Sequence, residues 1–585
     1  MNIEKLKKAA EKLDKKLPEE NPLKKTRIEE SKLSVSNVPN LATLIQNAAM
    51  LMKEKRIKKK KTKGLEIPAV VSSKVRGKKF EVPDLSKVDM IYPLIPQKPK
   101  RGEYIYAYAH ITWNKTKNIL RYEVIEPELN RNEKILLERV KETIQERLDI
   151  DFTKLNLSKA REYLDERFNE VLNFLGITLD VKKREKFQYY LYRDFIGIGK
   201  IEPLMHDPYI EDISCDGIGI PIYVYHRNPF FGSIETNVVF ETKEELDSFV
   251  MKLAQRGEKS ISMAEPLVDA SLPDGSRIQV TFGTDIAKRG SNFTIRKFTE
   301  KPMTPVDLIN FGTIDSKILA YLWFCIEHGK SILVSGGTAT GKTTMLNVLS
   351  MFIKPNMKVI SIEDTPELKF SHPHWISEVA RQPISEVGGK GFGQVDLYDL
   401  LKESLRQRPD YLIVGEVRGK EAYVLFQQMV TGHPGLSTIH AENIEKLMDR
   451  LTTEPINLSP SLIENLDIII FLKRVKRGSG YLRRISEILE MERYDKKEGR
   501  VVVNKVFEWN PVTDGFDSVN GSIILKKLSN YLGINPDRIK KDIMERMKII
   551  EWAKERKITD YEEFGKIIRM YYANSEELMK KMREY

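Results

Sequence analysis

The sequence predicts an α/β fold in which a parallel sheet with a phosphate-binding loop follows a smaller α+β domain. Helical and extended patterns alternate from Asp315 to Phe471, as they do in the βαβ units of parallel sheets. An apolar strand pattern over residues 332–335 runs directly into a glycine-rich loop, and a helical pattern follows. Residues 186–298 mix short strand patterns with two helical stretches, which is typical of an α+β unit.

Length and composition are consistent with several folded domains. The 585 residues correspond to about four domains, and a hydrophobic content of 41% can fill several cores. Cys215 and Cys325 lie far apart and no CxxC pair occurs, which excludes a disulfide scaffold, a zinc ribbon and a thioredoxin-type redox site. The start of the chain has no apolar signal core, and apolar stretches such as residues 468–472 are far shorter than the ~18 residues that span a bilayer. We therefore expect a cytoplasmic protein.

Residues 1–84 form a basic segment that we expect to be partly disordered. They hold 22 Lys and Arg against 11 Asp and Glu, which accounts for nearly all of the formal charge of +12. Two stretches, 3–17 and 38–52, repeat apolar residues at helical spacing and are amphipathic. Three interpretations stay open: a solvated tail, an anchor for anionic lipid or an acidic protein, and a nucleic-acid contact.

The remaining chain divides into five parts. A hairpin pattern around residues 104–126 and a helical pattern over 132–176 predict an N-terminal α+β adaptor at 85–185. Residues 186–298 form the α+β domain, with one helix ending near Gly197 and another from Glu241 to about Arg256. The proline-rich residues 299–310 predict a hinge, residues 311–520 the parallel-sheet domain, and residues 521–585 a helical C-terminal region.

The glycine-rich loop has the spacing GxxxxGK[ST]. Gly336 is followed by four residues and then by Gly341, Lys342 and Thr343. Glycines let backbone N–H groups surround phosphate oxygens, and the helix N-terminus adds its positive end. We expect Lys342 to pair with the β and γ phosphates and the Thr343 hydroxyl to ligate Mg²⁺. The expected nucleotide-binding residues are Gly336, Gly337, Thr338, Ala339, Thr340, Gly341, Lys342, Thr343 and Thr344.

Three further apolar runs end in side chains suited to phosphate chemistry. Glu363 and Asp364 follow the first run, Glu416 follows the second, and His440 follows a shorter third run that His433 precedes. Because ligands of open parallel sheets lie at the carboxyl ends of strands, we expect such residues beside the glycine-rich loop. No NKxD-type sequence for guanine recognition occurs, which favours ATP over GTP.

The motifs resemble those of the secretion ATPase superfamily, which serves type II and type IV secretion, type IV pili and the archaellum, and the similarity is greatest to its archaeal branch. They are the Walker A loop 336–344, an acidic box 362–368, a Walker B block 405–419, a histidine box 431–441, and segments 201–217, 264–279 and 293–298 of the preceding domain. The resemblance implies a RecA-like P-loop NTPase domain, preceded by a smaller α+β domain and accompanied by an N-terminal adaptor and a helical C-terminal region.

The resemblance also implies roles for single residues. Glu363 would orient or deprotonate the attacking water, and Glu416 would hold Mg²⁺ through water. His440, with His433, would sense the γ phosphate.

The resemblance also implies roles for two groups of arginines, one in the preceding domain and one in the Walker B block. Arg277 and Arg296 of the preceding domain would reach across a cleft to phosphate, so that hydrolysis depends on closure. Arg406, Arg408 and Arg418 lie in the Walker B block, where a phosphate contact and a structural ion pair are both open.

At the level of assembly, the resemblance implies a homohexamer that is peripheral at the inner face of the cell membrane. Its ATP-driven motions would act on a polytopic membrane platform protein and indirectly on pilin-like substrates. A RecA-like nucleic-acid translocase and a non-hydrolysing scaffold are the alternatives. The near-neutral charge of residues 85–585 argues against nucleic acid as a partner. Which filament or substrate is served, and whether assembly, retraction or secretion results, stays open.

Overall fold

The computed structural model describes Leu65 and residues 84–148, 156–228, 230–298, 301–381, 393–477, 480–495 and 500–584. Residues 1–62 form one unit of the chain and residues 63–585 another. Apart from Leu65 and Asp84, the basic segment 1–84 lies outside the described residues, so its predicted helices remain predictions. No helix in the described part of the chain is long and apolar enough to cross a membrane.

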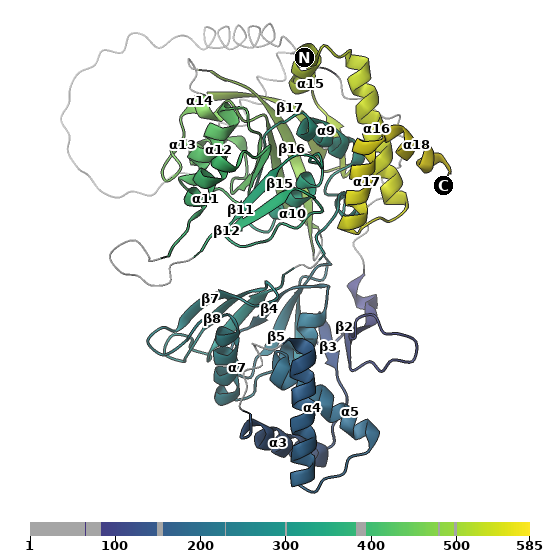
Figure 1. Ribbon diagram of the computed structural model, residues 1–585, viewed down its shortest axis with the longest axis vertical. Helices are drawn as coiled ribbons and strands as arrows, with labels where there is room; N and C mark the ends of the chain where they lie inside the picture. The colour runs from purple at the N-terminus through teal and green to yellow at the C-terminus, as the bar shows by residue number, and fades with distance from the viewer. Residues whose placement is uncertain are drawn as a thin grey trace, which may run out of the picture. The chain divides into compact units, whose positions relative to one another are not determined.

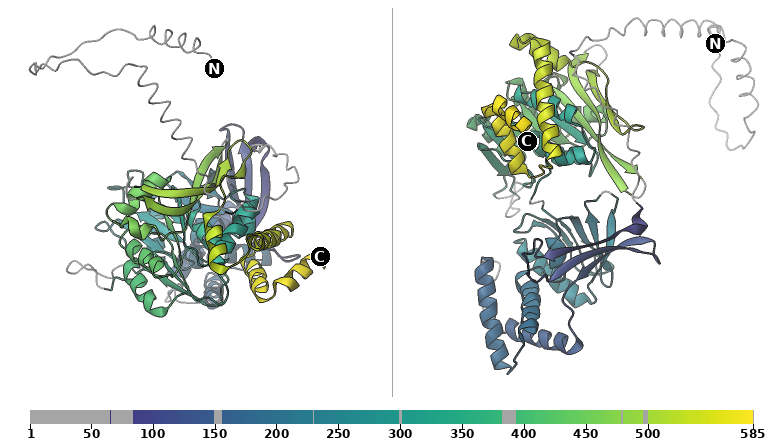
Figure 2. Two further views of the ribbon diagram at one scale, coloured as in Figure 1. Left: turned by 90° about the horizontal axis from the view of Figure 1, so that it is seen from above. Right: turned by 90° about the vertical axis from the view of Figure 1, so that its right-hand side faces the viewer.

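The first sheet has nine strands in the order β1-β2-β3-β6-β5-β4-β9-β8-β7. Its strands are β1 (Asp89–Ile95), β2 (Ala107–Asn114), β3 (Ile119–Ile125), β4 (Ile210–Cys215), β5 (Pro221–His226), β6 (Ser233–Val239), β7 (Leu267–Ser271), β8 (Arg277–Thr281) and β9 (Asn292–Arg296). The right-hand view of Figure 2 shows the purple strands of the first described residues continuing this sheet. The predicted division at residue 185 is therefore wrong for the strands, because β3 pairs in parallel with β6 through Arg121 and Glu235.

The helices α3 (Arg131–Gln145), α4 (Leu157–Phe174) and α5 (Val181–Leu191) form a core of their own, on which η3 (Tyr192–Ile196) packs. The short helices η4 (Gly199–Ile201) and α6 (Glu202–His206) bury Ile201 and Leu204 in the core of the first sheet instead, and η1 (Leu85–Lys87) precedes β1. Asn130 and Glu133 form a capping box that fixes the start of α3. Leu137, Phe168 and Phe187 are fully or almost fully buried in the shared core of α3, α4 and α5. A further helix, α7 (Lys243–Arg256), buries Leu246 and Val250 in the core of the first sheet.

The second sheet is RecA-like, with parallel strands in the order β12-β11-β13-β14-β10-β15. Figure 1 labels β11, β12 and β15 of this sheet. The strands are β10 (Ile332–Gly336), β11 (Val359–Glu363), β12 (Trp375–Val379), β13 (Tyr411–Val414), β14 (Gly435–Ile439) and β15 (Ile468–Arg477). The connecting helices are α10 (Lys342–Ser350), α11 (Leu397–Ser404), α12 (Glu421–Val430), α13 (Ile444–Thr452) and α14 (Pro460–Ile463), with η5 (Leu405–Gln407) after α11. The predicted parallel sheet is confirmed, and strands β10, β11, β13 and β14 are wholly buried.

An antiparallel extension, β16 (Gly480–Asp495), β17 (Arg500–Asn510) and β18 (Gly515–Ser518), continues the second sheet from β15. The helices α8 (Pro305–Asn310) and α9 (Ser316–Glu327) precede β10. Part of the predicted hinge is thus helical: Thr304 caps α8, and Pro305, Val306 and Leu308 are buried. The hinge prediction was wrong for residues 305–310, because these apolar side chains belong to the core of the second sheet.

The C-terminal residues form the predicted helical region, with α15 (Ile523–Leu532), α16 (Pro536–Glu555), α17 (Tyr561–Ala573) and α18 (Ser575–Glu584). Arg546 of α16 is 1% exposed and pairs with Asp542 at 2.7 Å and with Glu327 of α9. Its guanidinium also lies 4.9 Å from the ring centre of Trp323. A buried arginine needs such partners, so these contacts tie α16 to α9.

Candidate active site

The glycine-rich loop joins β10 to α10 at the carboxyl end of the parallel strands. A Cβ on Gly336 would lie 2.6 Å from the carbonyl oxygen of Leu472 in β15, so this approach requires glycine. Gly341 precedes α10 with a left-handed φ of 92°, which costs glycine little. The Thr340 hydroxyl donates to the Gly337 carbonyl at 2.9 Å and closes the loop. The open N-terminus of α10 then offers unpaired N–H groups to an anion.

Lys342, the first residue of α10, holds its ammonium group inside the loop. The residue is 8% exposed, and its Nζ donates to the Gly337 carbonyl at 3.0 Å. Nζ also lies 3.3 Å from Nδ1 of His440. Burial lowers the pKa of Lys342 to about 8. Since burial penalises the charged form, a polyanion bound here would restore the stability of the ammonium group.

Glu363 ends β11 with one carboxylate oxygen anchored and the other free. Oε1 accepts the backbone N–H groups of Glu367 and Leu368, each at 3.0 Å. Oε2 is buried and accepts no hydrogen bond from the described residues. Burial raises the pKa of Glu363 to about 7, against the lowering effects of the two N–H groups and of Arg277. A carboxylate with a near-neutral pKa and one free oxygen is suited to take a proton from water.

A line of polar contacts crosses the ends of the parallel strands. Nε2 of His440 lies 3.1 Å from Oε1 of Glu416. Because the Lys342 ammonium group can only donate, Nδ1 of His440 accepts and Nε2 carries the ring proton. Oε2 of Glu416 accepts a hydrogen bond from Nη2 of Arg418 at 2.7 Å. Nη1 of Arg418 lies 3.9 Å from Oδ2 of Asp364. Lys342 and His440 are thus in contact, and the His440 ring lies beside Glu416, although Oε1 of Glu416 accepts no hydrogen bond from the described residues. Arg418 links Glu416 to Asp364, which follows β11.

Arg277 and Arg296 are cross-strand neighbours on β8 and β9 of the first sheet. The charge of Arg277 opposes the burial that raises the pKa values of Glu363 and Asp364. The charge of Arg296 adds to burial in lowering the pKa of Lys342. Both arginines thus act electrostatically on residues at the carboxyl edge of the second sheet.

His433, Arg406 and Arg408 do not join this line of contacts. His433 precedes β14, whereas His440 follows it, and at about 3.3 Å per residue the two histidines lie at opposite ends of the strand. The Thr431 hydroxyl lies 3.1 Å from Nδ1 of His433. Arg406 and Arg408 likewise precede β13. The expectation that His433 contacts nucleotide was wrong for one chain, because a parallel strand separates it from the loop.

Sequence reasoning missed two arginines near the loop. Arg450 of α13 donates to the His440 carbonyl at 3.2 Å and adds positive charge beside Lys342. Arg483 of β16 donates through Nε to the Ala339 carbonyl at 3.0 Å. Neither lies in a motif or at a strand end facing the loop, so no local signal in the sequence could have identified them.

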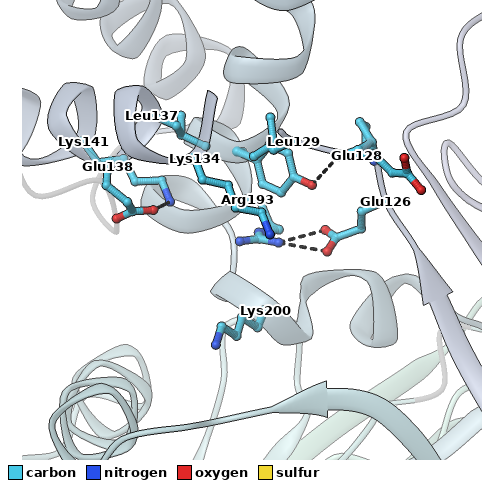
Figure 3. Close-up of a pocket in the computed structure, with 11 residues that line it drawn as sticks. Glu126, Glu128, Leu129, Lys134, Leu137, Glu138, Lys141, Arg193 and Lys200 are labelled. Atoms are coloured by element: carbon cyan, nitrogen blue, oxygen red, sulfur yellow. Dashed lines mark hydrogen bonds and ion pairs between the residues drawn. The ribbon is translucent and has the colours of Figure 1, made fainter. Parts of the chain in front are cut away.

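A cavity of about 690 Å³ lies away from the strand ends, between α3 and the residues near β3 (Figure 3). Arg193 pairs with Glu126 at 2.9 Å, and Lys141 pairs with Glu138 at 2.7 Å. The positive charges of Arg193 and Lys141 are thus already neutralised by carboxylates. The cavity therefore does not resemble a phosphate site.

Three comparisons relate the chain to known proteins. Residues 233–477 match the family model described as type II/IV secretion system protein. The uncharacterized protein MJ0900 of Methanocaldococcus jannaschii is 38% identical over 515 residues, covering 84% of this chain and 90% of that protein. The type IV secretion system protein VirB11 of Bartonella quintana is 26% identical over 278 residues, covering 40% of this chain and 77% of that protein. The solved structure of the Legionella pneumophila ATPase DotB has 17% identity and a TM-score of 0.36, covering 62% of this chain and 92% of that one.

The family match begins at β6 and ends with β15. It therefore includes the glycine-rich loop, Glu363, Glu416, His440, and both Arg277 and Arg296. The relationship to MJ0900 extends over nearly the whole of that protein. The chain belongs to the type II/IV secretion system protein family.

Proposed function

We propose that the protein is an ATP hydrolase whose domain motions power assembly of a type IV pilus-like filament or secretion through a membrane platform. The observation that carries the proposal is the convergence of Lys342, Glu363, Glu416 and His440 on the phosphate loop at one sheet edge. A scaffold that only binds nucleotide would not need a buried carboxylate with a free oxygen at this place. Family membership supports secretion or filament assembly as the work that hydrolysis drives.

In this proposal, Glu363 accepts the proton of the attacking water. Its anchored Oε1 fixes the carboxylate plane, while Oε2 remains available. Lys342 binds the β and γ phosphates, and His440 responds to the γ phosphate through its contact with Lys342. The γ phosphate would thereby compete with His440 for the ammonium protons, and this competition would be passed on to Glu416.

Mg²⁺ fits the donors at this edge. The Thr343 hydroxyl and the Glu416 carboxylate supply the hard oxygen atoms that the ion prefers. Burial alone would raise the pKa of Glu416, but Arg418, His440 and Lys342 together lower it, which keeps the carboxylate ionised. Among the described residues no group of three His, Cys, Asp or Glu could hold a metal by itself, in agreement with an ion that keeps water and phosphate ligands. When bound, Mg²⁺ would neutralise charge on the β and γ phosphates.

Closure of the first sheet over the second would complete the site. Arg277 and Arg296 supply positive charge from β8 and β9, where transition-state charge on phosphate needs it. We propose that six copies form a ring at the cytoplasmic face of the membrane and that each cycle of closure moves a polytopic platform protein. Residues 1–84 would attach the ring to that protein or to anionic lipid.

Phosphate release and binding of a fluorescent ATP analogue test this function. Lys342→Ala is expected to abolish phosphate release and to weaken ATP binding strongly, because the variant lacks the charge that holds the β and γ phosphates. Lys402→Ala is the matched control, since Lys402 is an exposed lysine of α11. Wild-type phosphate release by Lys342→Ala would exclude the loop as the hydrolytic site.

A further inference from the structure

Arg483 is bonded to the phosphate loop from a strand that no motif marks. Its Nε donates to the carbonyl of Ala339 at 3.0 Å. Ala339 has a left-handed φ of 58°, a conformation that a residue with a Cβ adopts at a cost and keeps only where its surroundings hold it. The Cδ of Arg483 would also lie 3.4 Å from a Cβ on Gly341. Arg483 therefore donates a hydrogen bond to the strained residue of the loop and lies close to Gly341.

The other end of the same guanidinium faces the first sheet. Nη2 of Arg483 lies 3.7 Å from Oε2 of Glu211 in β4, and both side chains are about one-third exposed or less. Asp212 follows Glu211 and is the register partner of Arg296 in β9. Burial and the charge of Glu211 raise the pKa of Asp212, and the charges of Arg296 and Arg483 oppose them. Arg483 thus belongs to the same group of charges as one of the arginines expected to reach phosphate.

A second arginine of the β15–β16 hairpin provides a comparison. Nη2 of Arg474 donates to the Tyr225 hydroxyl of β5 at 2.8 Å, and its guanidinium lies 3.8 Å from the ring centre of Tyr481. The hairpin therefore contacts the first sheet at two places. Of these two arginines, Arg483 is the one bonded to the phosphate loop.

We propose that Arg483 is a positioning residue that couples the phosphate loop to the first sheet. A guanidinium is planar and holds its N–H groups in fixed relative directions, so pairing with Glu211 aims Nε at the Ala339 carbonyl. When the first sheet is docked, the loop apex is held in the conformation that receives phosphate. When the Glu211 contact opens, the loop loses that support. The proposal rests on the proposed ATPase function and adds a route by which domain closure affects the loop.

A double-mutant cycle on the full-length protein tests the coupling. Arg483→Ala is expected to lower turnover about tenfold and to weaken binding of a fluorescent ATP analogue several-fold. Glu211→Gln is expected to lower turnover about threefold when Arg483 is present and to have no effect in the Arg483→Ala background. Arg483→Lys keeps the charge that faces Glu211 but loses the second fixed donor, so it is expected to restore only part of the activity.

Controls separate this role from a general loss of structure. Arg474→Gln removes a contact with the first sheet without touching the loop, and we expect its turnover to stay within about twofold of wild type. Thermal melting of every variant monitors folding, including any effect of Glu211→Gln on Arg227, whose pKa also responds to Glu211. If Arg483→Ala does not fold, the cycle is run with Arg483→Lys.

Two results would overturn the coupling. One is an equal loss on Glu211→Gln with and without Arg483. The other is an Arg483→Ala variant with wild-type turnover and affinity. The analogue-binding cycle does not require hydrolysis, so a wild-type protein that binds the analogue without releasing phosphate would contradict the proposed function and still test the coupling.

Discussion

The side chain of Glu363 packs directly over the α-carbon of Gly415. A Cβ on Gly415 would lie 3.1 Å from Cγ of Glu363 and 3.5 Å from its Cβ. Gly415 follows β13, the strand that pairs with β11. The position where many phosphate-binding sheets carry an acid is therefore glycine here because the neighbouring strand's carboxylate occupies the space, and the acid Glu416 follows one residue later.

Gly415→Ala is expected to displace Glu363 by a few tenths of an ångström. Such a shift moves the proposed base without touching the phosphate loop, so turnover should fall about three- to tenfold while ATP affinity is retained. Steady-state kinetics and analogue binding measure the two effects separately. Gly515→Ala is the control, because its new Cβ would meet only an ordinary contact at 3.4 Å. Equal losses of affinity and turnover in Gly415→Ala would show that the loop, and not Glu363, had moved.

The pH dependence of turnover should report Glu363. Burial raises the pKa of this carboxyl to about 7, and only its ionised form can accept a proton. The value of kcat/KM reports the free enzyme, so it should rise with pH through about 7 as Glu363 ionises. It should fall again above about 8, where burial lets Lys342 lose the proton that holds the phosphates. A profile that is flat between pH 5.5 and 8 would be inconsistent with Glu363 as the base, provided that the protein stays folded over that range.

Arg277→Ala should move this profile in a known direction. The charge of Arg277 lowers the pKa of Glu363, so its removal raises that pKa and shifts the acid limb of kcat/KM to higher pH. Turnover at neutral pH should fall while nucleotide affinity changes by no more than a few-fold. A shift to lower pH, or none, would mean that Arg277 does not face Glu363 in the active protein.

Leu65 gives a boundary for removing the basic segment. Leu65 exchanges two backbone hydrogen bonds with Ser522, at 2.9 and 2.8 Å, and packs against the core of the second sheet. Deletion of residues 1–62 keeps these contacts, whereas deletion of 1–84 removes them and should lower the free energy of unfolding by about 2 kcal/mol. Denaturant unfolding of both truncated proteins checks this difference. Identical stabilities would mean that the Leu65 contact contributes nothing.

The deletion of residues 1–62 also tests the proposed anchor. It removes most of the excess positive charge without the loss of the Leu65 contacts. We expect the full-length protein to sediment with anionic vesicles at low salt and to be released at high salt, and the truncated protein to stay in solution. Equal sedimentation of both proteins would identify the segment as a solvated tail.

Sequence reasoning located the parts of the site that depend on chain order alone. The loop at Gly336–Thr344 is contiguous, and Glu363, Glu416 and His440 each follow an apolar run, so the parallel sheet brings them to one edge. The expectation for His433 rested on the family resemblance and not on this rule, because His433 precedes its strand and so lies at the end away from the loop.

Other features depend on contacts between distant residues. Arg483 lies more than a hundred positions after Ala339 and reaches it only because β16 pairs beside β15. The parallel pairing of Arg121 with Glu235 joins strands that the sequence assigns to separate units. Such pairings depend on tertiary packing, which local patterns do not encode.

Single-turnover hydrolysis by Glu363→Gln tests the central claim most directly. The variant keeps the size of the side chain and loses the base, so ATP should bind within a few-fold of wild type while the rate of hydrolysis falls at least about a hundredfold. Glu403→Gln, which changes an exposed glutamate of α11, should hydrolyse ATP at the wild-type rate. Hydrolysis by Glu363→Gln at the wild-type rate would contradict the assignment of Glu363 as the base and of this sheet edge as the site arranged around it.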